Sequence, residues 1–197
     1  MSLSLKKNID IIDKKTLYSG FFELYQFTLK HKKHDSSWSK LLTREIFSGA
    51  QVITVLPYDP QTKKIILIDQ FRTGLVEKVH DPIIKEIVGG IIDKEESPEE
   101  AAIRECKEET GCSVHKLKKI FSYYPAPGSS QSYYHLFLAE VVSFEGERIL
   151  GVEGEDEDLL VRSYSTDEVK TMLNEGRFIN GATLIALQWF FLNYIIS

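Results

Sequence analysis

The sequence predicts a mixed α/β fold in which helices cover the faces of a sheet. Three observations indicate this class. Residues 51–58 and 64–72 are runs rich in valine and isoleucine, as in buried strands. Residues 98–110 have the pattern of a capped helix, and an apolar helix is expected at about 181–194. The chain has 197 residues, 43% of them apolar, which is enough for one substantial domain with an appendage.

The first 48 residues are expected to form a separate N-terminal β-strand segment. Residues 16–31 are aromatic and rich in β-forming residues. A polar turn at 31–37 and a second extended run at 41–47 follow, and together these runs predict a hairpin. We expect residues 49–197 to form the main domain.

The main domain should begin with a second hairpin, because the turn residues Asp59-Pro60-Gln61-Thr62 join the two buried strands. A short strand at 84–88 is predicted to end at Gly89-Gly90. The remaining elements are expected in this order: strands at 114–124 and 133–142 around a Pro/Gly/Ser loop at 125–132, an acidic loop at 145–158, a strand at 159–164, and helices at 166–175 and 181–194. The last helix is apolar around most of its circumference, so it should be buried against a sheet or a partner.

Composition excludes some classes of partner. A net charge of −5 argues against a dedicated nucleic-acid binder, which normally carries a basic surface. No run approaches the ~18–20 apolar residues of a membrane span, and residues 1–7 lack the apolar centre of a secretory signal. A cytoplasmic protein without nucleic-acid or membrane partners is therefore expected. Cys106 and Cys112 are interpreted as reduced, small apolar residues.

The helix at 98–110 has strong signals at both ends. Ser97 is a good N-cap, Pro98 suits the first helical position, and Glu100 completes a capping box. Gly111 stands where a left-handed C-terminal cap is expected.

Three carboxylates of this helix should share one face. Glu105 lies three and four residues before Glu108 and Glu109, at the end of the helix where the macrodipole is negative. Arg104 offsets only part of the resulting repulsion, whereas a divalent cation would offset all of it. Oxygen ligands favour Mg²⁺, with Mn²⁺ as a possible substitute. The alternative interpretation is a glutamate-rich helix face exposed to solvent.

The arrangement from Gly90 through Glu96 to Arg104-Glu105-Cys106-Lys107-Glu108-Glu109-Thr110-Gly111-Cys112 resembles a complete Nudix box. Proteins of this family typically hydrolyse a nucleoside diphosphate linked to another group, and their fold is an α/β/α sandwich with a mixed sheet. The resemblance implies the following roles: Glu105 and Glu109 as metal ligands, Glu108 in support, Arg104 orienting a glutamate, Glu96 stabilising the loop, and the Gly89 carbonyl as a further ligand.

Outside the box the chain resembles bacterial ADP-ribose pyrophosphatases over most of its length. The matching stretches are Thr16–Phe22, Arg44–Phe47, Leu56–Pro60, Ile68–Arg72 and Ala186–Trp189. The resemblance implies cleavage of ADP-ribose to AMP and ribose 5-phosphate. It also implies a homodimer in which the N-terminal strands exchange between subunits.

The same resemblance assigns substrate contacts. Phe21 would stack on the base, Arg44 would flank it with Glu45 beside it, and Arg72 would contact a phosphate; an aromatic face and a guanidinium suit these tasks. Each has a structural alternative. Phe21 is also typical of a core residue, and both arginines are typical of surface ion pairs.

The acidic segment at 153–158 is the second feature that carries chemistry by resemblance. Glu155 is expected to be the general base and Glu157 a metal ligand, with Glu153 as the alternative base. A mobile acidic loop closing over the substrate would suit both roles. Without the resemblance, five acids in six residues indicate a solvated loop.

One position departs from the resemblance. The loop around Gly128 usually carries a glutamate at the place of Ser132, where it holds the terminal ribose. Hydrolysis of another nucleoside diphosphate sugar, such as GDP-mannose or UDP-glucose, therefore remains an alternative. A non-catalytic nucleotide-sensing domain and an RNA-decapping enzyme are less favoured, because no box glutamate is missing and no basic stripe is present.

Overall fold

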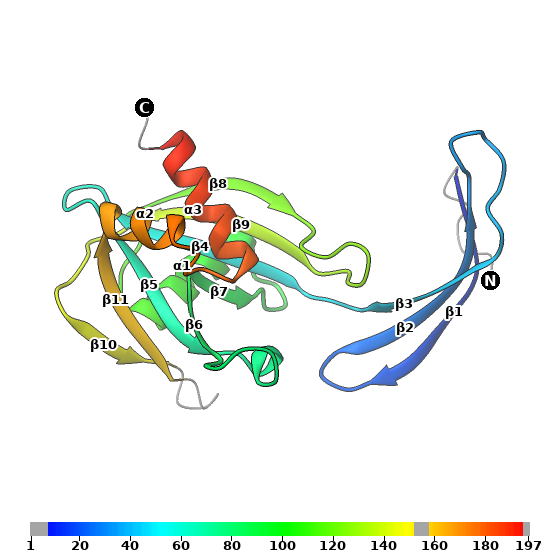
Figure 1. Cartoon of the computed structure of the whole chain (residues 1–197), viewed down its shortest axis with the longest axis horizontal. Coiled ribbons are helices and arrows are strands. Elements are labelled where there is room, and N and C mark those ends of the chain that lie inside the picture. The colour runs from blue at the N-terminus through cyan, green and yellow to red at the C-terminus, as the bar shows by residue number, and fades with distance from the viewer. Residues whose placement is uncertain (1–7, 152–157, 195–197) are drawn as a thin grey trace. The chain divides into compact units, whose positions relative to one another are not determined.

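A computed structural model of the chain describes residues 8–151 and 158–194. It divides into two compact units. Unit 1 contains the residues up to Ala50 together with Tyr124–Tyr133, and unit 2 contains Gln51–Tyr123 together with the residues from Tyr134 onwards. Each unit is described by itself below (Figure 1).

Unit 1 contains a three-stranded antiparallel sheet in the order β1-β2-β3. Its strands are β1 (Ile9–Ser19), β2 (Glu23–His31) and β3 (Leu42–Phe47). The predicted hairpin corresponds to β2 and β3, but the prediction of one extended run at 16–31 was wrong. A turn at 20–22 divides that run, and β1 extends back to Ile9. The aromatic residues of this turn have β-forming propensity and so concealed it from a compositional prediction.

A loop of unit 1 packs against the end of β3. Phe47 donates its N–H to the Ser129 carbonyl at 2.9 Å and accepts from the Gln131 N–H at 3.0 Å. Gly49 adopts a positive φ of 69°, and a Cβ there would lie 2.1 Å from the Ser132 nitrogen. Glycine is therefore required at this position for both conformation and space.

Unit 2 is built on an eight-stranded sheet. Six strands follow the order β10-β11-β5-β4-β9-β8, while β6 pairs with β5 and β7 pairs with β4. The strands are β4 (Gln51–Asp59), β5 (Lys64–Phe71), β6 (Ile83–Glu86), β7 (Val88–Ile91), β8 (Lys116–Tyr123), β9 (Tyr133–Glu140), β10 (Glu147–Leu150) and β11 (Leu159–Ser165). A short 3₁₀ helix, η1 (Thr73–Leu75), follows β5.

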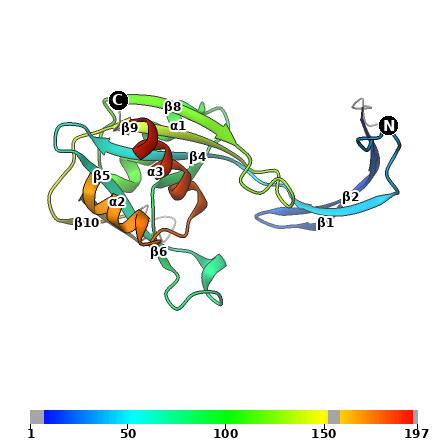
Figure 2. The ribbon, with the colours of Figure 1, turned by 45° about the horizontal axis from the view of Figure 1, so that its top comes forward.

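Helices cover both faces of this sheet (Figures 1 and 2). One face packs on α1 (Pro98–Thr110), through a cluster that includes Ile53, Ala102 and Phe137. The other face of the sheet packs on α2 (Thr166–Asn174) and α3 (Gly181–Asn193), through a cluster that includes Leu187 and Phe190. Burial of apolar side chains on both faces explains why β4 and β5 are almost continuously apolar. The predicted α/β/α class is confirmed.

Two predicted boundaries were wrong. Gly89 and Gly90 do not end a strand but lie inside β7, after a break at Ile87 that separates it from β6. The predicted acidic loop at 145–158 contains a short edge strand, β10, which has only four residues and two adjacent apolar ones, so it did not stand out from its acidic surroundings. No helix among the described residues is long and apolar enough to span a membrane.

Candidate active site

Local sequence signals fix α1 as predicted. The Ser97 hydroxyl accepts from the Glu100 N–H, and the Glu100 carboxylate accepts from the Ser97 N–H at 2.9 Å, which completes the capping box. Gly111 caps the other end with a φ of 70°. Ala101, Ala102 and Cys106 are fully buried against the sheet. The helix is thus anchored by one face and both ends, and this orients the charged residues of its other faces.

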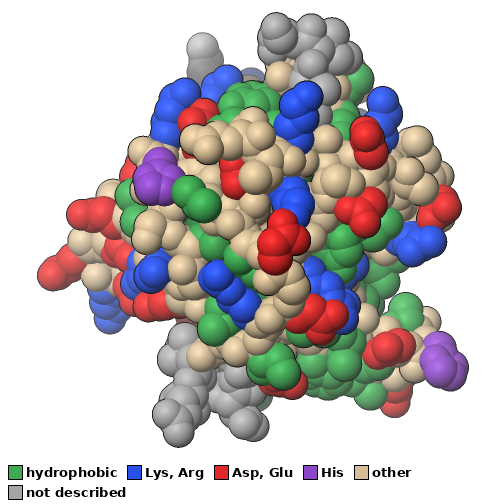
Figure 3. All heavy atoms as spheres, turned by 90° about the vertical axis from the view of Figure 1, so that its left-hand side faces the viewer, with side chains coloured by type: hydrophobic (Ala, Val, Ile, Leu, Met, Phe, Trp, Pro, Cys, Tyr) green, Lys and Arg blue, Asp and Glu red, His purple; other side chains and the backbone are tan. Residues whose placement is uncertain are grey.

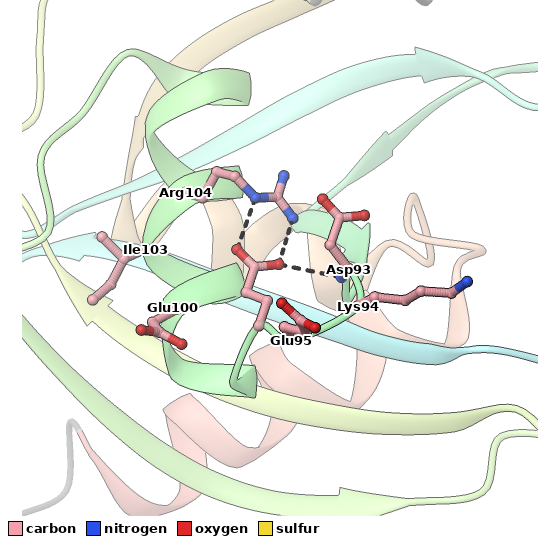
Figure 4. Close-up of a pocket in the computed structure, with 7 residues that line it drawn as sticks. Asp93, Lys94, Glu95, Glu100, Ile103 and Arg104 are labelled. Carbon is pink, nitrogen blue, oxygen red and sulfur yellow. Dashed lines mark hydrogen bonds and ion pairs between the residues drawn. The ribbon is translucent and has the colours of Figure 1, made fainter.

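Arg104 gathers three carboxylates around one guanidinium. Its Nε and Nη2 donate to the two Glu96 oxygens at 2.9 and 3.0 Å. Its Nη1 donates to Glu105 at 2.8 Å and to Glu108 at 2.9 Å. The hydrogen bonds with Glu96 come first among the causes that raise the pKa of Arg104. Figure 4 shows Arg104 reaching from α1 over the loop that carries Asp93. Arg104 therefore orients Glu105 and ties the loop to the helix.

Glu105 lies directly against the backbone of β7. A Cβ built on Gly90 would come within 2.0 Å of a Glu105 oxygen, so glycine leaves the room that this carboxylate occupies. The Glu105 side chain is 15% exposed, whereas that of Glu108 is 39% exposed. Of these two carboxylates, Glu105 is thus the one enclosed between the helix and the strand.

Glu109 is a buried carboxylate, with 3% of its surface exposed. One of its oxygens accepts from the Gly89 N–H at 3.3 Å. A buried carboxylate needs compensating hydrogen bonds or positive charge. Glu105 and Glu109 therefore meet neighbouring residues of the same strand, Gly90 and Gly89.

These donors suit a hard divalent cation, but the described residues do not form a complete site. Carboxylate oxygens are the ligands that Mg²⁺ and Mn²⁺ prefer. Among the described residues, no group of three or more histidine, cysteine, aspartate or glutamate side chains is arranged to hold a metal ion. Glu155 and Glu157, the predicted base and ligand, and the alternative base Glu153 lie outside the described residues.

Arg72 follows β5 and pairs with a carboxylate that the sequence did not reveal. Its Nε donates to Glu86 at 2.9 Å, and Asn180 donates to the other Glu86 oxygen at 2.8 Å. Burial alone would lower the pKa of Arg72, but the hydrogen bond and charge of Glu86, with a further contribution from Glu109, raise it. Arg72 thus lies within electrostatic reach of Glu109, one of the α1 carboxylates. An acid inside the apolar run 84–88 was the only signal of Glu86 in the sequence.

The predicted base-binding residues lie in unit 1. Phe21 occupies the turn between β1 and β2, is 84% exposed, and meets Phe22 edge-to-face at 4.7 Å between ring centroids. Arg44 and Glu45 lie on β3, opposite Phe27 and Gln26. The predicted alternative of Phe21 as a core residue does not fit its exposure. All three residues belong to unit 1, whereas the α1 carboxylates belong to unit 2.

Ser132 lies at an apolar cavity within unit 1. This cavity of about 290 Å³ is lined by Phe22, Phe47, Gly49, Ser130 and Ser132. The Ser132 hydroxyl accepts from the Ser130 hydroxyl at 3.0 Å and lies 3.4 Å from the Ala50 nitrogen. Gly128 is exposed in the loop before it, and a Cβ there would meet open space. Ser132 is therefore engaged in holding the loop.

A second cavity, of about 570 Å³, flanks the loop before α1 in unit 2. It is lined by Asp93, Lys94, Glu95, Glu96, Glu100, Ile103 and Arg104 (Figure 4). Glu105 and Glu109 are not among these residues, so the cavity lies beside the carboxylate cluster. On the face shown in Figure 3, basic and acidic side chains of the described residues are interspersed, without a continuous basic stripe.

Comparison with known proteins places this site in a family. The NUDIX domain family matches residues 49–183. The chain is 35% identical to the ADP-ribose pyrophosphatase of Haemophilus influenzae over 192 residues, which cover 96% of this chain and 88% of that protein. It is 33% identical to the ADP-ribose pyrophosphatase of Escherichia coli K12, covering 96% and 90% of the two chains.

Other relatives carry a different name. The chain is 32% identical to the GDP-mannose pyrophosphatase of Pectobacterium atrosepticum, covering 91% of this chain and 92% of that protein. A crystal structure described as an ADP compounds hydrolase superimposes with a TM-score of 0.71 and 21% identity over 98% of this chain and 99% of that one, and so supports the fold. Since the family match spans most of the chain and includes all of α1 with its carboxylates, this protein belongs to the NUDIX family.

Proposed function

We propose that this protein hydrolyses the diphosphate bond of a nucleoside diphosphate sugar, with ADP-ribose as the first candidate. The observation that carries the proposal is the carboxylate arrangement of α1, in which Arg104 holds Glu105 and Glu109 is buried against β7. A cluster of this kind concentrates negative charge in a place where only a cation neutralises it. Relatives named as pyrophosphatases of ADP-ribose and of GDP-mannose support the reaction class.

The metal in this proposal is Mg²⁺, with Mn²⁺ as a substitute. Glu105 and Glu109 would hold it together with the Gly89 carbonyl, while Glu108 supports the cluster. When bound, such a cation neutralises the diphosphate and lowers the pKa of the attacking water. Arg104 holds the Glu105 carboxylate in one orientation through its hydrogen bond. Arg72 supplies a fixed positive charge for a phosphate oxygen.

Proton removal is proposed for Glu155. It would take a proton from the water that attacks one phosphorus, the bond from that phosphorus to the bridging oxygen would break, and Glu157 would add a metal ligand. Glu155→Gln should lower kcat by roughly 10²–10⁴-fold with little change in KM. If Glu155→Gln is inert and Glu153→Gln has the large effect, the base is Glu153.

A second candidate substrate is GDP-mannose. A serine at position 132 offers a neutral hydroxyl that already bonds within the loop, whereas a carboxylate would be needed to hold a ribose diol as the resemblance implies. The relatives named GDP-mannose pyrophosphatase add support for this candidate.

A homodimer with exchanged N-terminal strands is also part of the proposal. The described residues of unit 1 include no helix, and its strands and turns expose large apolar side chains, among them Ile12, Leu17, Tyr18, Phe21, Phe22, Trp38, Leu41 and Phe47. A second copy of the chain would cover such a surface. Light scattering coupled to gel filtration should give twice the 22.6 kDa chain mass, and a monomer at micromolar concentration would contradict the dimer. The proposed compartment is the cytoplasm, consistent with two buried, unpaired cysteines.

A panel of nucleotide sugars tests the function directly. ADP-ribose, GDP-mannose and UDP-glucose are incubated with the protein and Mg²⁺, and release of AMP, GMP or UMP is followed by chromatography. The proposal predicts AMP from ADP-ribose at the highest kcat/KM. Preferred release of GMP would support the second candidate, and tight nucleotide binding without any product would indicate a sensing domain.

A further inference from the structure

A buried anion lies beside Arg72 at the end of β6. The Glu86 side chain is 2% exposed, whereas the Arg72 side chain is 41% exposed. Two groups of Arg72, Nε and Nη2, both donate to the same Glu86 oxygen, at 2.9 and 2.5 Å. In this pair the Glu86 carboxylate is shielded from water, whereas the Arg72 guanidinium remains accessible to solvent.

The second Glu86 oxygen is held from α3. Asn180, the N-cap of that helix, donates its amide to Glu86 at 2.8 Å. The Asn180 carbonyl oxygen accepts from the Thr183 N–H and hydroxyl at 3.0 and 3.2 Å. The Thr183 hydroxyl in turn accepts from the Ile87 N–H at 3.1 Å. Because Ile87 adjoins Glu86, the chain of hydrogen bonds closes on itself and fixes the carboxylate from both sides.

Stability alone is a weak reason for this arrangement. A buried ion pair is often no more stabilising than well-packed apolar side chains of the same size, since both charges lose water. What the network does supply is orientation. A guanidinium is planar and carries five N–H groups, so fixing two of them on Glu86 fixes the direction of the others. Arg72 is also within electrostatic reach of the buried Glu109.

We propose that Glu86 and Asn180 are positioning residues that hold the Arg72 guanidinium in the orientation in which its remaining N–H groups bind the substrate diphosphate. The inference rests on the proposed function for the identity of that diphosphate. Neither residue needs to touch the substrate, because both act through Arg72. Arg72 is then a pre-oriented phosphate ligand rather than a surface cation.

An exchange of hydrogen-bonding groups tests the network. Glu86→Gln places an amide donor opposite the Asn180 amide, so two donors face each other and the side chain turns or shifts. Adding Asn180→Asp restores an acceptor at that place and still leaves an N-cap oxygen for Thr183. The readouts are kcat and KM for ADP-ribose and the dissociation constant of ADP measured with EDTA present, which needs neither metal nor turnover.

For Glu86→Gln we expect weaker ADP binding and a kcat/KM lower by roughly 10–100-fold, carried more by KM than by kcat. The double variant should recover most of both losses, because the two changes are coupled. Asp69→Asn is the matched control. It removes a carboxylate of β5 that pairs with Lys85 and Arg162, and it should leave ADP affinity and kcat/KM unchanged.

Asn180→Ser keeps the experiment decisive if Glu86→Gln does not fold. Serine caps α3 but removes the amide that holds Glu86, so ADP binding should again weaken. Unchanged ADP affinity in the folded variants, or a double variant no better than Glu86→Gln alone, would overturn the inference. A wild-type protein that binds ADP but cleaves no nucleotide sugar would overturn the proposed function alone, since ADP affinity still reports on Glu86.

Discussion

Two regions of the molecule, the surroundings of α1 in unit 2 and the sheet of unit 1, differ in how completely their side chains find partners within the chain. Around α1, the carboxylates of Glu96, Glu105, Glu108 and Glu109 have hydrogen-bond partners, the helix ends are capped, and one helix face is buried in the core. In unit 1, aromatic side chains of β1 and of the turn that follows it are exposed to solvent, Tyr18 by 63% and Phe21 by 84%. The region around α1 is stabilised by contacts within its own chain, whereas unit 1 leaves apolar surface available to a ligand or to another subunit.

This difference suits two tasks, catalysis at α1 and recognition of a substrate or of another subunit in unit 1. In the proposed function the α1 carboxylates need a rigid frame, because a metal and a diphosphate would have to meet oxygens at fixed positions. Exposed aromatic residues suit contact with a base or with another subunit, for which a flat apolar surface is sufficient. Changes near α1 should therefore alter kcat, and changes in unit 1 should alter substrate affinity or assembly. The predictions below test that division.

Among the residues that the structure describes, the largest effect is expected at Glu105. Glu105→Gln should lower kcat by roughly 10²–10³-fold, as for the loss of one strong electrostatic contact to a transition state. The free energy of unfolding should change by about 1 kcal/mol or less, because the lost pair with Arg104 is offset by reduced repulsion from Glu108. Steady-state kinetics and urea denaturation measure the two. Glu99→Gln, an exposed position in the first turn of α1, is the control and should match the wild type.

A smaller effect on binding is expected at Phe21. Phe21→Ala should raise KM for ADP-ribose by about tenfold, the lower end of what base stacking contributes. Its high exposure means that the free energy of unfolding should change by no more than about 0.5 kcal/mol. If KM stays constant while the protein dissociates into monomers, Phe21 serves the subunit contact and not the base.

Asp59 should affect stability without affecting catalysis. One of its oxygens accepts from the Gln61 and Thr62 N–H groups and the other from Ser143, at 2.8 to 3.2 Å. Burial alone would raise the pKa of Asp59, but these hydrogen bonds outweigh it and hold the pKa well below its usual range. Asp59→Asn should lower the free energy of unfolding by about 2 kcal/mol at pH 7 and leave kcat unchanged.

The pH dependence of this contribution follows from the sign of the shift. Because the folded protein binds the Asp59 proton less readily than the unfolded chain, the stabilisation is complete above the unfolded pKa of about 3.9 and is lost as the pH falls below it. Denaturation curves at pH 7 and pH 3 should therefore show a smaller difference between wild type and Asp59→Asn at pH 3. An equal difference at both values would contradict the assignment.

The smallest effect, that of a thiol reagent on the native protein, is expected at the cysteines of α1 and of the loop that follows it. Cys106 and Cys112 are both buried, and burial raises the pKa of the Cys106 thiol to about 12. A thiol in this state forms almost no thiolate at neutral pH. A thiol reagent should therefore react with neither residue in the native protein and with both in urea. Rapid reaction without denaturant would show that α1 opens.

Local signals were enough to predict α1. Its N-cap, proline, capping box and terminal glycine act within a few residues, so the sequence predicted the helix from Pro98 to Thr110. The carboxylate positions followed from the helical repeat, and their clustering with Arg104 is found in the structure. The role of Gly90 was not visible from the sequence, because the space it leaves is defined by a helix that comes later in the chain.

Long-range contacts could not be predicted in the same way. Glu86 pairs with Arg72 across 14 residues and with Asn180 across 94, and nothing in the neighbouring sequence distinguishes it from an edge-strand acid. The turn that divides β1 from β2 was missed for a related reason. Its aromatic residues have the propensity of the strands on either side, and only pairing with the partner strand reveals where the chain reverses.

The metal dependence of cleavage tests the central claim most directly. ADP-ribose is incubated with wild type and with Glu105→Gln, in Mg²⁺ and in excess EDTA, and phosphorus NMR follows the diphosphate signals. We expect these signals to give way to the phosphomonoester signals of AMP and ribose 5-phosphate in wild type with Mg²⁺, and to persist in the other three samples. Equal cleavage in EDTA, or by Glu105→Gln at the wild-type rate, would contradict the assignment of the α1 carboxylates to metal-dependent diphosphate hydrolysis.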